Sequence, residues 1–372
     1  MRRDLKFSII GAGNGGMAMA AYLAMIGYEV NLYNRTLENI FSLIKSPIVS
    51  LTGEKEGFGV LNRVTNIMKE AIEGVDIIMV TVPAMGHYQM TMEMAPYLED
   101  GQVIVLNPGR TGGALEVYET LRKQNCEKQV IVAEAQSFIY ACRSTSTNSA
   151  HIFKMKKEVT IAAIPSYKTD YVINLLKHAY PQFIPAKDVL ETSINNYGAI
   201  FHPAPTLLNS GHIERGAPFE YYTEGITPSI GEFLEKMDNE RMEIGKILKV
   251  ETLSAKDWLY ETYGASGSNL YETVQNNPAY KGLQAPKGLS IRYIYEDVPY
   301  SLVPMSSLAR ELGIKTPAIN SIINVAELMT GRNFFEEGRT IERLGLDGLS
   351  IYEMHRIAQV GKLDKKEEEV VA

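Results

Sequence analysis

The fold of this chain is decided by the stretch from Lys6 to Ala20, which reads Lys-Phe-Ser-Ile-Ile-Gly-Ala-Gly-Asn-Gly-Gly-Met-Ala-Met-Ala. The apolar run from Phe7 to Ile10 has no helical period, so it predicts a buried strand. The glycine-rich turn that follows leads into a segment of Ala, Met and Leu with a helical period, which Gly27 ends. The stretch therefore predicts a strand, a glycine turn and a helix in that order.

The glycines of this turn have the spacing Gly11-x-Gly13-x-x-Gly16. In a dinucleotide-binding turn, the first glycine permits the tight bend, the second lets the backbone approach a pyrophosphate, and the third lets helix and strand pack closely. The phosphates then face the free N–H groups at the helix N-terminus. We expect these glycines, together with Asn14 and Gly15, to bind a nicotinamide dinucleotide.

The end of the second predicted strand, Tyr28 to Tyr33, lies roughly 20 residues past the glycines, where such units bind the adenosine ribose. A carboxylate there favours NAD, because it accepts hydrogen bonds from the ribose hydroxyls and repels the 2′-phosphate of NADP. Here the residues are Asn34, Arg35 and Thr36, so the acid is absent. Arg35 offers a planar fork that suits a phosphate. We expect NADP ahead of NAD; the alternative is a solvated Arg35 and an Asn34 that bonds a ribose hydroxyl of NAD.

Two further strand ends are expected at the same edge of the sheet. A buried strand that starts at Val75 closes at Val82, Pro83 and Ala84, and the next strand ends at Asn107. In a doubly wound sheet, the carboxyl ends of neighbouring strands meet the cofactor. We therefore expect Pro83 and Ala84 to border the adenosine and ribose, Val82 to contribute to the cofactor site beside them, and Asn107 to reach the nicotinamide ribose.

The composition of the whole chain limits its function. A chain of 372 residues fits two domains, and a net charge of −7 without a basic run argues against a nucleic-acid surface. The two cysteines have no metal-ligand spacing, so we expect neither a metal site nor a disulfide framework. The first strand begins too early for a signal peptide, and no apolar run is long enough to cross a bilayer. We expect a cytoplasmic protein without membrane partners.

The order of the predicted elements indicates an α/β fold with two domains. Alternating strands and helices predict a Rossmann-type, doubly wound parallel sheet, which segments 130–134 and 152–164 are expected to extend. From about residue 187 helical periodicity takes over, in segments 189–209, 230–250, 255–263, 318–329 and 351–358. We predict a dinucleotide-binding domain over 1–186 and a mainly α-helical substrate domain over 187–372, whose helices offer surfaces for a homodimer.

One histidine of the helical half is placed for chemistry. His202 lies in an apolar, helix-like segment at a point where Pro203 and Pro205 would bend the chain. An imidazole in such surroundings needs a partner, and the structural alternative is a core histidine that is simply hydrogen-bonded. Asn196 on the same segment is expected either to orient a substrate or to cap or pack a helix.

A charged pair of residues lies in a second apolar segment of the helical half. Arg292 and Asp297 are separated by Tyr-Ile-Tyr-Glu, and Pro299 follows the acid. Charges with such neighbours are not expected to face bulk water all at once. The pair is either a functional site or an ion pair that only stabilises the fold.

Four motifs together resemble a known family. They are Gly-Ala-Gly-Asn-Gly-Gly-Met-Ala at 11–18, Val-Pro-Ala-x-x-His at 82–87, His-Pro-x-Pro-x-Leu-Leu-Asn-x-Gly at 202–211 and Glu-Asp-Val-Pro-x-x-Leu-Val-Pro at 296–304. The sequence resembles the octopine/nopaline (opine) dehydrogenase family over nearly its whole length, and the motif at 202–211 is far more specific than the glycine turn.

The resemblance implies a dinucleotide-binding domain joined to a helical opine dehydrogenase domain. Such enzymes reductively condense the amino group of an amino acid with a 2-oxo acid, often pyruvate. Carried over to this chain, the family's catalytic histidine falls on His202, its partner acid on Asp297, and the arginine that holds the oxo-acid carboxylate on Arg292. Many NADH-using relatives have an acid at the position of Asn34. This difference affects which cofactor is expected and does not affect the expected reaction.

Two other functions fit the same predicted architecture. A two-domain dehydrogenase of keto acids or hydroxy acids would work without an amine. A non-catalytic NAD(P)-sensing protein would bind the cofactor and turn nothing over. Amine-dependent oxidation of the reduced cofactor distinguishes the opine dehydrogenase from both.

Overall fold

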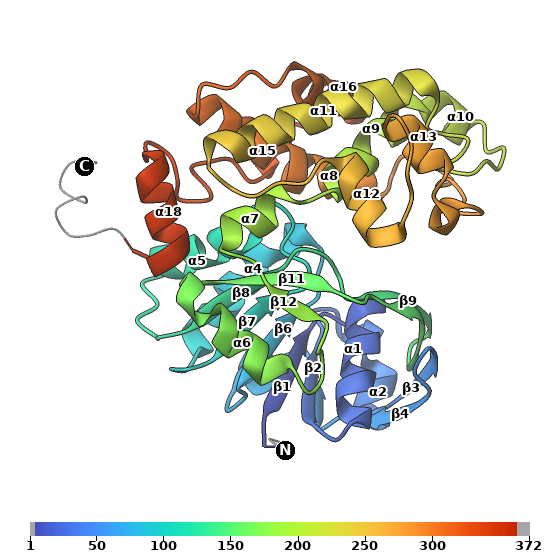
Figure 1. Ribbon diagram of the computed structural model, residues 1–372. Coiled ribbons are helices and arrows are strands. Elements are labelled where there is room, and N and C mark those ends of the chain that lie inside the picture. Colours follow the sequence, from blue (N-terminus) through green and yellow to red (C-terminus); the bar gives the residue numbers. More distant parts are fainter. Residues whose placement is uncertain (1–3, 363–372) are drawn as a thin grey trace. The chain divides into compact units, whose positions relative to one another are not determined.

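The computed structural model describes residues 4–362, and the chain divides into two compact units (Figure 1). The first unit runs up to Thr192 and resumes at Leu349, whereas the second is Ser193–Gly348. The first unit contains both β-sheets, and the second is built mainly from helices. The predicted fold class, a Rossmann-type sheet followed by a helical domain, is confirmed.

The last helix belongs to a different unit from the one predicted. Helix α18 (Ile351–Val360) was expected in the helical domain, but it packs against β11 (Val159–Ile164) of the first unit. Its buried residues Met354 and Ala358 lie on one helical face, and the Tyr118 hydroxyl donates a hydrogen bond to the Gly361 carbonyl at its end. Helical periodicity predicts an apolar face correctly, but it carries no information about which partner covers that face.

The first unit is organised around an eight-stranded sheet with the order β12-β11-β8-β7-β6-β1-β2-β5. Strand β1 (Lys6–Ile10) lies between β2 (Glu29–Tyr33) and β6 (Ile77–Val80) and is parallel to both. The strand order thus reverses at β1, which is the topological switch point of a doubly wound sheet. The other strands are β5 (Arg63–Thr65), β7 (Val103–Leu106), β8 (Ile131–Ala135), β11 and β12 (Phe183–Pro185).

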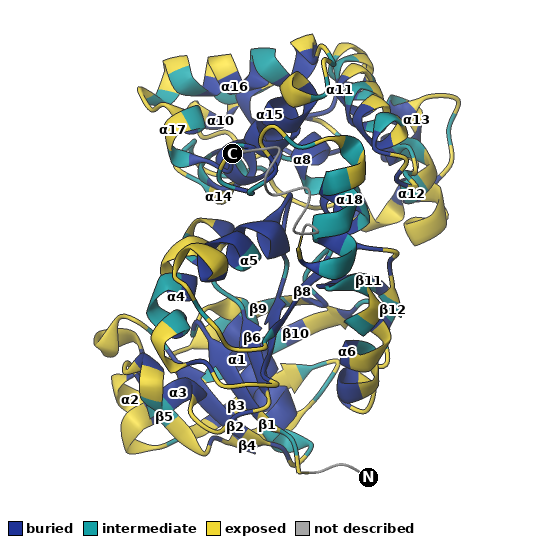
Figure 2. Ribbon diagram, turned by 90° about the vertical axis from the view of Figure 1, so that its left-hand side faces the viewer, coloured by how far each residue is buried: buried dark blue, intermediate teal, exposed yellow. Residues whose placement is uncertain are grey.

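One edge of this sheet is mixed rather than parallel. Strand β11 runs antiparallel to β8, and β12 runs parallel to β11. The centre of the sheet follows the prediction, because all residues of β6 and β7 are buried, as strands covered on both faces require (Figure 2).

The helices of the first unit connect these strands and cover the sheet. They are α1 (Asn14–Met25), α2 (Phe41–Lys45), α3 (Met68–Ile72), α4 (His87–Met94), α5 (Gly113–Lys123), α6 (Thr169–Leu176) and α18. Helix α7 (Val189–Ile194) carries the chain from the first unit into the second.

A second sheet of four strands packs on helix α1. Its order is β4-β3-β10-β9, and its strands are β3 (Ile48–Gly53), β4 (Gly57–Val60), β9 (Tyr140–Ser146) and β10 (Ser149–Met155). The expectation that 152–164 extends the main sheet was therefore wrong for its first half. Because α1 is covered by both sheets, all its residues from Gly16 to Leu23 are buried, which explains why the sequence of this helix has no polar face.

The second unit packs around its longest helix, α11 (Pro228–Ile247). The Thr227 side chain caps this helix by accepting a hydrogen bond from the Ile230 amide, and Pro228 occupies a first-turn position. The other helices are α8 (Gly198–Phe201), α9 (Pro203–Leu208), α10 (Ser210–Glu214), α12 (Ala255–Tyr263), α13 (Leu270–Gln275), α14 (Arg292–Tyr295), α15 (Val303–Glu311), α16 (Pro317–Thr330) and α17 (Phe334–Glu337).

The single helix expected over 189–209 is interrupted in the structure. It becomes α7, α8 and α9, with a break at His202 between the last two. Pro203 has no N–H to continue the hydrogen-bond ladder of the preceding helix, so it begins a new one instead. The expected helices at 230–250, 255–263 and 318–329 are confirmed as α11, α12 and α16.

Candidate functional site

The glycine turn has the backbone geometry that a dinucleotide needs. Gly11 has φ +110°, which favours glycine, and its amide donates a hydrogen bond to the Tyr33 carbonyl. A methyl group on Gly16 would lie 1.7 Å from the Gly11 carbonyl oxygen, so this position must stay bare for the helix to pack on the turn. A methyl group on Gly13 would meet nothing within 4 Å. Open space at Gly13 is where a pyrophosphate approaches the backbone in such turns.

Two other residues of the turn hold α1 against its surroundings. A methyl group on Gly15 would reach a ring atom of Phe138 at 2.5 Å. The Asn14 side-chain oxygen accepts a hydrogen bond from the Ser144 amide of β9 at 2.8 Å. The Asn14 contact joins the start of α1 to the second sheet, and Gly15 leaves room for the Phe138 ring.

The end of β2 supports the turn from the side. The Asn34 side-chain oxygen accepts from the Ala12 amide at 3.1 Å, and its amide nitrogen donates to the Thr36 carbonyl at 2.8 Å. Both ends of this side chain therefore fix backbone beside the glycines. Arg35 and Thr36 are exposed, so the guanidinium is open to an anion in solution.

The segment after β6 touches the other side of the turn. The Thr81 hydroxyl donates to the carbonyls of Ile10 and Gly11, a role that the sequence analysis missed. A methyl group on Gly11 would meet a methyl of Val82 at 2.8 Å. After Val82, Pro83 is exposed and Ala84 is buried at the start of a single helical turn, η2 (Ala84–Gly86). The strand expected from Val75 to Val82 includes Thr81, whereas β6 ends at Val80, so no separate signal in the sequence marked this residue.

Asn107 follows β7 and is 2% exposed. Its side-chain nitrogen donates to the Val105 carbonyl at 2.9 Å, while its side-chain oxygen has no hydrogen-bond partner within residues 4–362. A buried amide oxygen without a hydrogen-bond partner destabilises the folded protein, and a ribose hydroxyl could donate the missing hydrogen bond. The strands that precede Gly11, Asn34, Thr81 and Asn107 lie side by side in the sheet, so these residues share its carboxyl edge and fit a nicotinamide dinucleotide.

The second unit brings His202 and Asp297 together. The imidazole Nδ1 lies 2.9 Å from a carboxylate oxygen of Asp297, although 95 positions separate them in the chain. Asp297 is fully buried, and the His202 side chain is 21% exposed. The ring nitrogen Nε2 makes no hydrogen bond to any residue in the described range 4–362. The carboxylate fixes the orientation of the ring.

Three further residues hold this histidine in place, and the sequence analysis named none of them. The ring of Tyr293 stacks on the imidazole with centroids 4.2 Å apart. The hydroxyls of Tyr221 and Thr206 both donate to the His202 carbonyl, at 2.7 and 2.8 Å. Burial raises the pKa of Tyr221 well above its usual value, so it remains a neutral donor.

Arg292 makes an ion pair with a different acid from the one considered in the sequence. Its Nε lies 2.9 Å from the carboxylate of Glu296, which directly follows α14, while Asp297 pairs with His202. The Arg292 side chain is 62% exposed, and Glu296 is 2% exposed. The alternative of an Arg292–Asp297 ion pair is thus not found, and most of the guanidinium surface faces solvent.

Asn196 is buried and donates from its side-chain nitrogen to the Ser301 hydroxyl at 2.9 Å. Ser301 lies in the π-helical turn η6 (Val298–Leu302), directly after Asp297. The contact links the segment before His202 to the segment after Asp297, so Asn196 helps to set the geometry of the pair.

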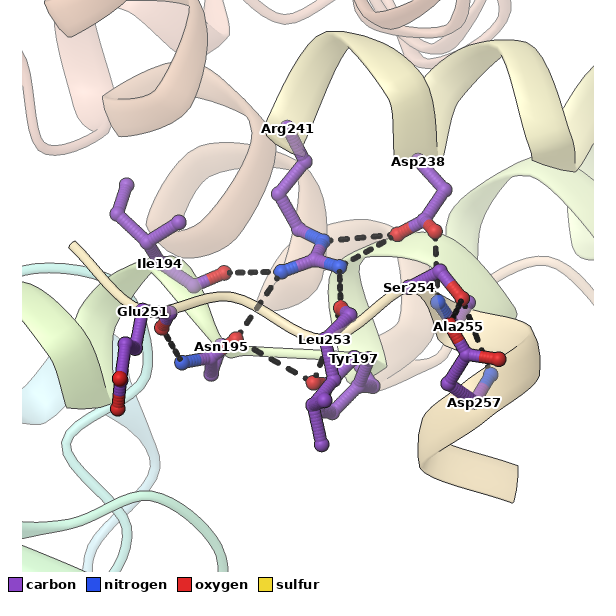
Figure 3. A network of polar contacts seen from close by, with 10 residues as sticks. All are labelled: Ile194, Asn195, Tyr197, Asp238, Arg241, Glu251, Leu253, Ser254, Ala255 and Asp257. Carbon is purple, nitrogen blue, oxygen red and sulfur yellow. Dashed lines mark hydrogen bonds and ion pairs between the residues drawn. The ribbon is translucent and has the colours of Figure 1, made fainter. Parts of the chain in front are cut away.

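A buried arginine supports the same region (Figure 3). Arg241 of α11 is fully buried; it pairs with Asp238 and donates to the carbonyls of Ile194 and Leu253 and to the side-chain oxygen of Asn195. These bonds fix α11 to the chain that leads to α8 and His202. The i, i+3 spacing of an acid and an arginine on this amphipathic helix was a signal that the sequence analysis did not use.

Two family models match the chain. Residues 185–330 match the α-helical domain of NAD/NADP octopine/nopaline dehydrogenase, and residues 6–125 match the NAD-binding domain of 6-phosphogluconate dehydrogenase. A curated opine dehydrogenase from Arthrobacter sp. (strain 1C) is 37% identical over 345 residues, which cover 92% of this chain and 96% of the relative.

Solved structures show the same fold. An octopine dehydrogenase in complex with NADH and agmatine has a TM-score of 0.81 at 21% identity, covering 97% of this chain and 99% of that one. A yersinopine dehydrogenase with bound NADP+ has a TM-score of 0.75 at 16% identity, covering 96% and 99%. The identity with the Arthrobacter enzyme over nearly the full length of both chains confirms the predicted resemblance, and this chain belongs to the opine dehydrogenase family.

Proposed function

We propose that this chain catalyses the reductive condensation of an amino acid with a 2-oxo acid, and that His202 carries the protons of the reaction. The observation that carries the proposal is the contact between His202 Nδ1 and the fully buried Asp297 carboxylate. A histidine held in this way keeps one ring nitrogen in a fixed hydrogen bond and offers the other to a substrate.

The reaction requires several proton transfers near neutral pH. The amine nitrogen attacks the carbonyl carbon of the oxo acid, and loss of water from the adduct forms an imine. His202 Nε2 can accept a proton from the attacking nitrogen and return one to the departing hydroxyl. Asp297 stabilises the imidazolium that exists between these steps, while Tyr293 and Tyr221 hold the ring and its backbone in position. NAD(P)H, when bound, supplies the hydride that reduces the imine carbon.

Arg292 is proposed to bind the carboxylate of the oxo acid, with pyruvate as the expected substrate. Its guanidinium is largely exposed, and among the described residues 4–362 its ion-pair partner is Glu296, which lies next to Nε. The terminal nitrogens can therefore form two parallel hydrogen bonds to a carboxylate, which orients the oxo acid and balances its charge. Asn196 supports the His202–Asp297 geometry through Ser301.

NADPH is proposed as the preferred cofactor over NADH. Asn34 replaces a carboxylate that would repel a 2′-phosphate, and the next residue, Arg35, is exposed. Because Asn34 is occupied by Ala12 and Thr36, Arg35 is the residue at this strand end that can take a phosphate bidentately.

The assay that tests the proposal follows NADPH and NADH oxidation with pyruvate alone and then with pyruvate plus each amino acid. We expect oxidation only when both substrates are present, and a product whose mass equals that of a secondary-amine dicarboxylic acid. Oxidation at the same rate without an amine would identify a keto-acid reductase instead. Binding of NADPH without turnover of any pair would identify a cofactor sensor.

A further inference from the structure

Two tyrosines that the proposed mechanism does not use lie in the second unit near His202. Tyr222 is in the segment that leads to α11, and Tyr280 ends the single helical turn η5 (Pro278–Tyr280). Their rings stack with centroids 4.0 Å apart, and the two residues are 9% and 7% exposed. Both rings therefore belong to the packed interior of the second unit.

The backbone also fixes this pair. The amide of Tyr221, the residue before Tyr222, donates a hydrogen bond to the Leu283 carbonyl at 2.7 Å. Leu283 lies in the segment that directly follows Tyr280. The relative position of the two tyrosines is thus set by a backbone hydrogen bond as well as by ring stacking.

The hydroxyl groups of these two tyrosines are available to a ligand. Neither forms a hydrogen bond with any other residue in the described range 4–362. Neither is among the polar atoms of this range that are sealed from solvent, so a ligand can reach both. A tyrosine hydroxyl in a packed region usually has a hydrogen-bond partner. Two rigid, reachable hydroxyls without one indicate a place where a ligand accepts hydrogen bonds.

A continuous row of rings connects this pair to the proposed proton-transfer residue. The ring of Tyr293, which stacks on the His202 imidazole, has its centroid 5.4 Å from that of Tyr221. The Tyr221 ring in turn lies 4.9 Å from the ring of Tyr222, which stacks on Tyr280. All these residues belong to the second unit, so their placement depends on that unit alone.

Electrostatic effects agree with this placement. Burial raises the pKa of Tyr222 well above its usual value, and Tyr293 and then Asp297 raise it further. Burial raises the pKa of Tyr280 in the same way, with Tyr222 as the next cause. The two hydroxyls therefore lie near the acid that pairs with His202, and they remain neutral donors near neutral pH.

The proposed reaction indicates what such donors bind. The amino acid must bring its nitrogen to His202 Nε2, and its carboxylate is attached to the carbon that bears this nitrogen. The carboxylate therefore comes close to the imidazole whatever the side chain of the amino acid is. It has two acceptor oxygens, and two phenol hydroxyls supply one donor each. The other carboxylate of the reaction, from the oxo acid, is already assigned to Arg292.

We propose that the hydroxyls of Tyr222 and Tyr280 bind the carboxylate of the amino-acid substrate. The inference rests on the proposed function, because it assigns the second of the two carboxylates that this reaction joins. It predicts that the enzyme prefers an amino acid to the amine that lacks only its carboxylate.

The test compares Tyr222→Phe and Tyr280→Phe with the unchanged enzyme, with pyruvate and NADPH. Each substitution removes one hydroxyl and keeps the ring. The donors are the amino acid that the unchanged enzyme uses best and the matching amine, such as 3-methylbutylamine for L-leucine or agmatine for L-arginine. We expect kcat/KM for the amino acid to fall by about ten- to a hundredfold in each variant, as for loss of a hydrogen bond to a charged group. The value for the amine should stay unchanged.

Tyr260→Phe is the matched control, because Tyr260 lies on α12 of the same unit and is 61% exposed. It should leave all these constants unchanged. Should the unchanged enzyme not turn over the amine, the inhibition constant of the amine against the amino acid replaces kcat/KM and should be the same in all variants. Without substrate, neither Tyr222→Phe nor Tyr280→Phe should lower the Tm, because the hydroxyl removed makes no hydrogen bond within residues 4–362.

Three results would overturn the inference. The first is an equal loss with the amino acid and its amine, which together with a lowered Tm would give the hydroxyls a structural role. The second is a rise confined to the KM for pyruvate, which would assign them to the oxo acid. The third is unchanged kinetics with the amino acid in both variants. Failure of the proposed function is seen separately, in the unchanged enzyme, as NADPH oxidation with pyruvate irrespective of any amine.

Discussion

His202 is the single residue on which turnover is expected to depend most. His202→Ala removes the group proposed to move protons, so kcat should fall by about 10²- to 10⁴-fold. The dissociation constant of NADPH should stay unchanged, because the residues expected to bind it belong to the first unit. Initial rates and titration of the cofactor fluorescence measure the two quantities separately.

His212→Ala serves as the control for this experiment. His212 is a histidine of the same unit that stacks on Phe219 with ring centroids 4.0 Å apart. We expect normal turnover in this variant. Equal activity of the His202 and His212 variants would remove His202 from the mechanism.

Arg292→Ala should act on substrate binding rather than on proton transfer. Loss of a bidentate carboxylate contact is expected to raise the KM for pyruvate by about tenfold or more, with a smaller change in kcat. Arg332→Ala is the matched control, since Arg332 also pairs with a nearby glutamate, Glu337, and is partly exposed. An unchanged KM for pyruvate in Arg292→Ala would mean that the guanidinium does not bind the oxo acid and only forms an ion pair with Glu296.

Arg35→Ala tests the cofactor assignment. The variant should raise the KM for NADPH by about tenfold or more and leave the KM for NADH nearly unchanged, because only NADPH carries the 2′-phosphate. Arg63→Ala, on the neighbouring strand β5, should change neither constant. A similar increase in the KM for both cofactors would show that Arg35 does not recognise the 2′-phosphate of NADPH.

In the unit formed by the first strand, the glycine turn and the first helix, substitutions of two glycines by alanine are expected to have different effects. Gly16→Ala places a methyl group 1.7 Å from a backbone carbonyl, so the helix must move and the protein should lose stability. Gly13→Ala meets nothing within 4 Å, so the fold should persist while the methyl group occupies the space of the pyrophosphate.

Thermal unfolding and NADPH titration distinguish these two glycine variants. We expect a lowered Tm for Gly16→Ala, and an unchanged Tm with weakened NADPH binding for Gly13→Ala. Normal NADPH affinity in Gly13→Ala would mean that the cofactor does not approach the backbone at that residue.

Helix α11 is expected to depend on its buried arginine. Arg241→Met leaves the Asp238 carboxylate and two carbonyls without their donor in a dry environment, which should lower the free energy of unfolding by about 3–5 kcal/mol (Figure 3). Lys246→Met on the same helix breaks an exposed pair with Glu243 and should cost about 1 kcal/mol or less. Urea unfolding measures both, and similar losses would contradict the importance of burial.

On the scale of the whole molecule, the first unit is assembled from two distant parts of the chain. Met354 of α18 is fully buried against that unit, so Met354→Ala should lower its stability by about 2–5 kcal/mol. Tyr352→Ala, on an exposed position of the same helix, should have little effect. NADPH should counteract the loss, because a ligand stabilises the unit that binds it, and unfolding followed with and without NADPH checks this.

Much of the fold could be predicted from local patterns. The glycine turn, the buried strands and the longest helices all leave a period or a spacing in the sequence, and the structure has them at the expected places. The second sheet could not be predicted in this way, because β3 and β10 pair although about a hundred positions separate them. A short apolar run predicts that a strand is present, but it does not predict which other strand pairs with it.

The candidate site shows the same division. Sequence and family resemblance indicated His202, Asp297 and Arg292, but the ion-pair partner of Arg292 was a different acid from the one considered. The contacts of Tyr293, Tyr221 and Thr81 left no spacing to recognise, since each depends on how two separate segments pack. Asn14 and Asn34, expected at the cofactor, also hold backbone in place.

The sequence by itself determined the glycine turn and the class of the fold, because these follow from local chemistry and from motifs of fixed spacing, and its family resemblance indicated His202 and Asp297 as candidate site residues. Only the tertiary structure decided that α18 belongs with the first unit and that Arg292 pairs with Glu296. The physical reason is that pairing between distant segments is fixed by the shape and burial of complete surfaces, and no local pattern of residues records it.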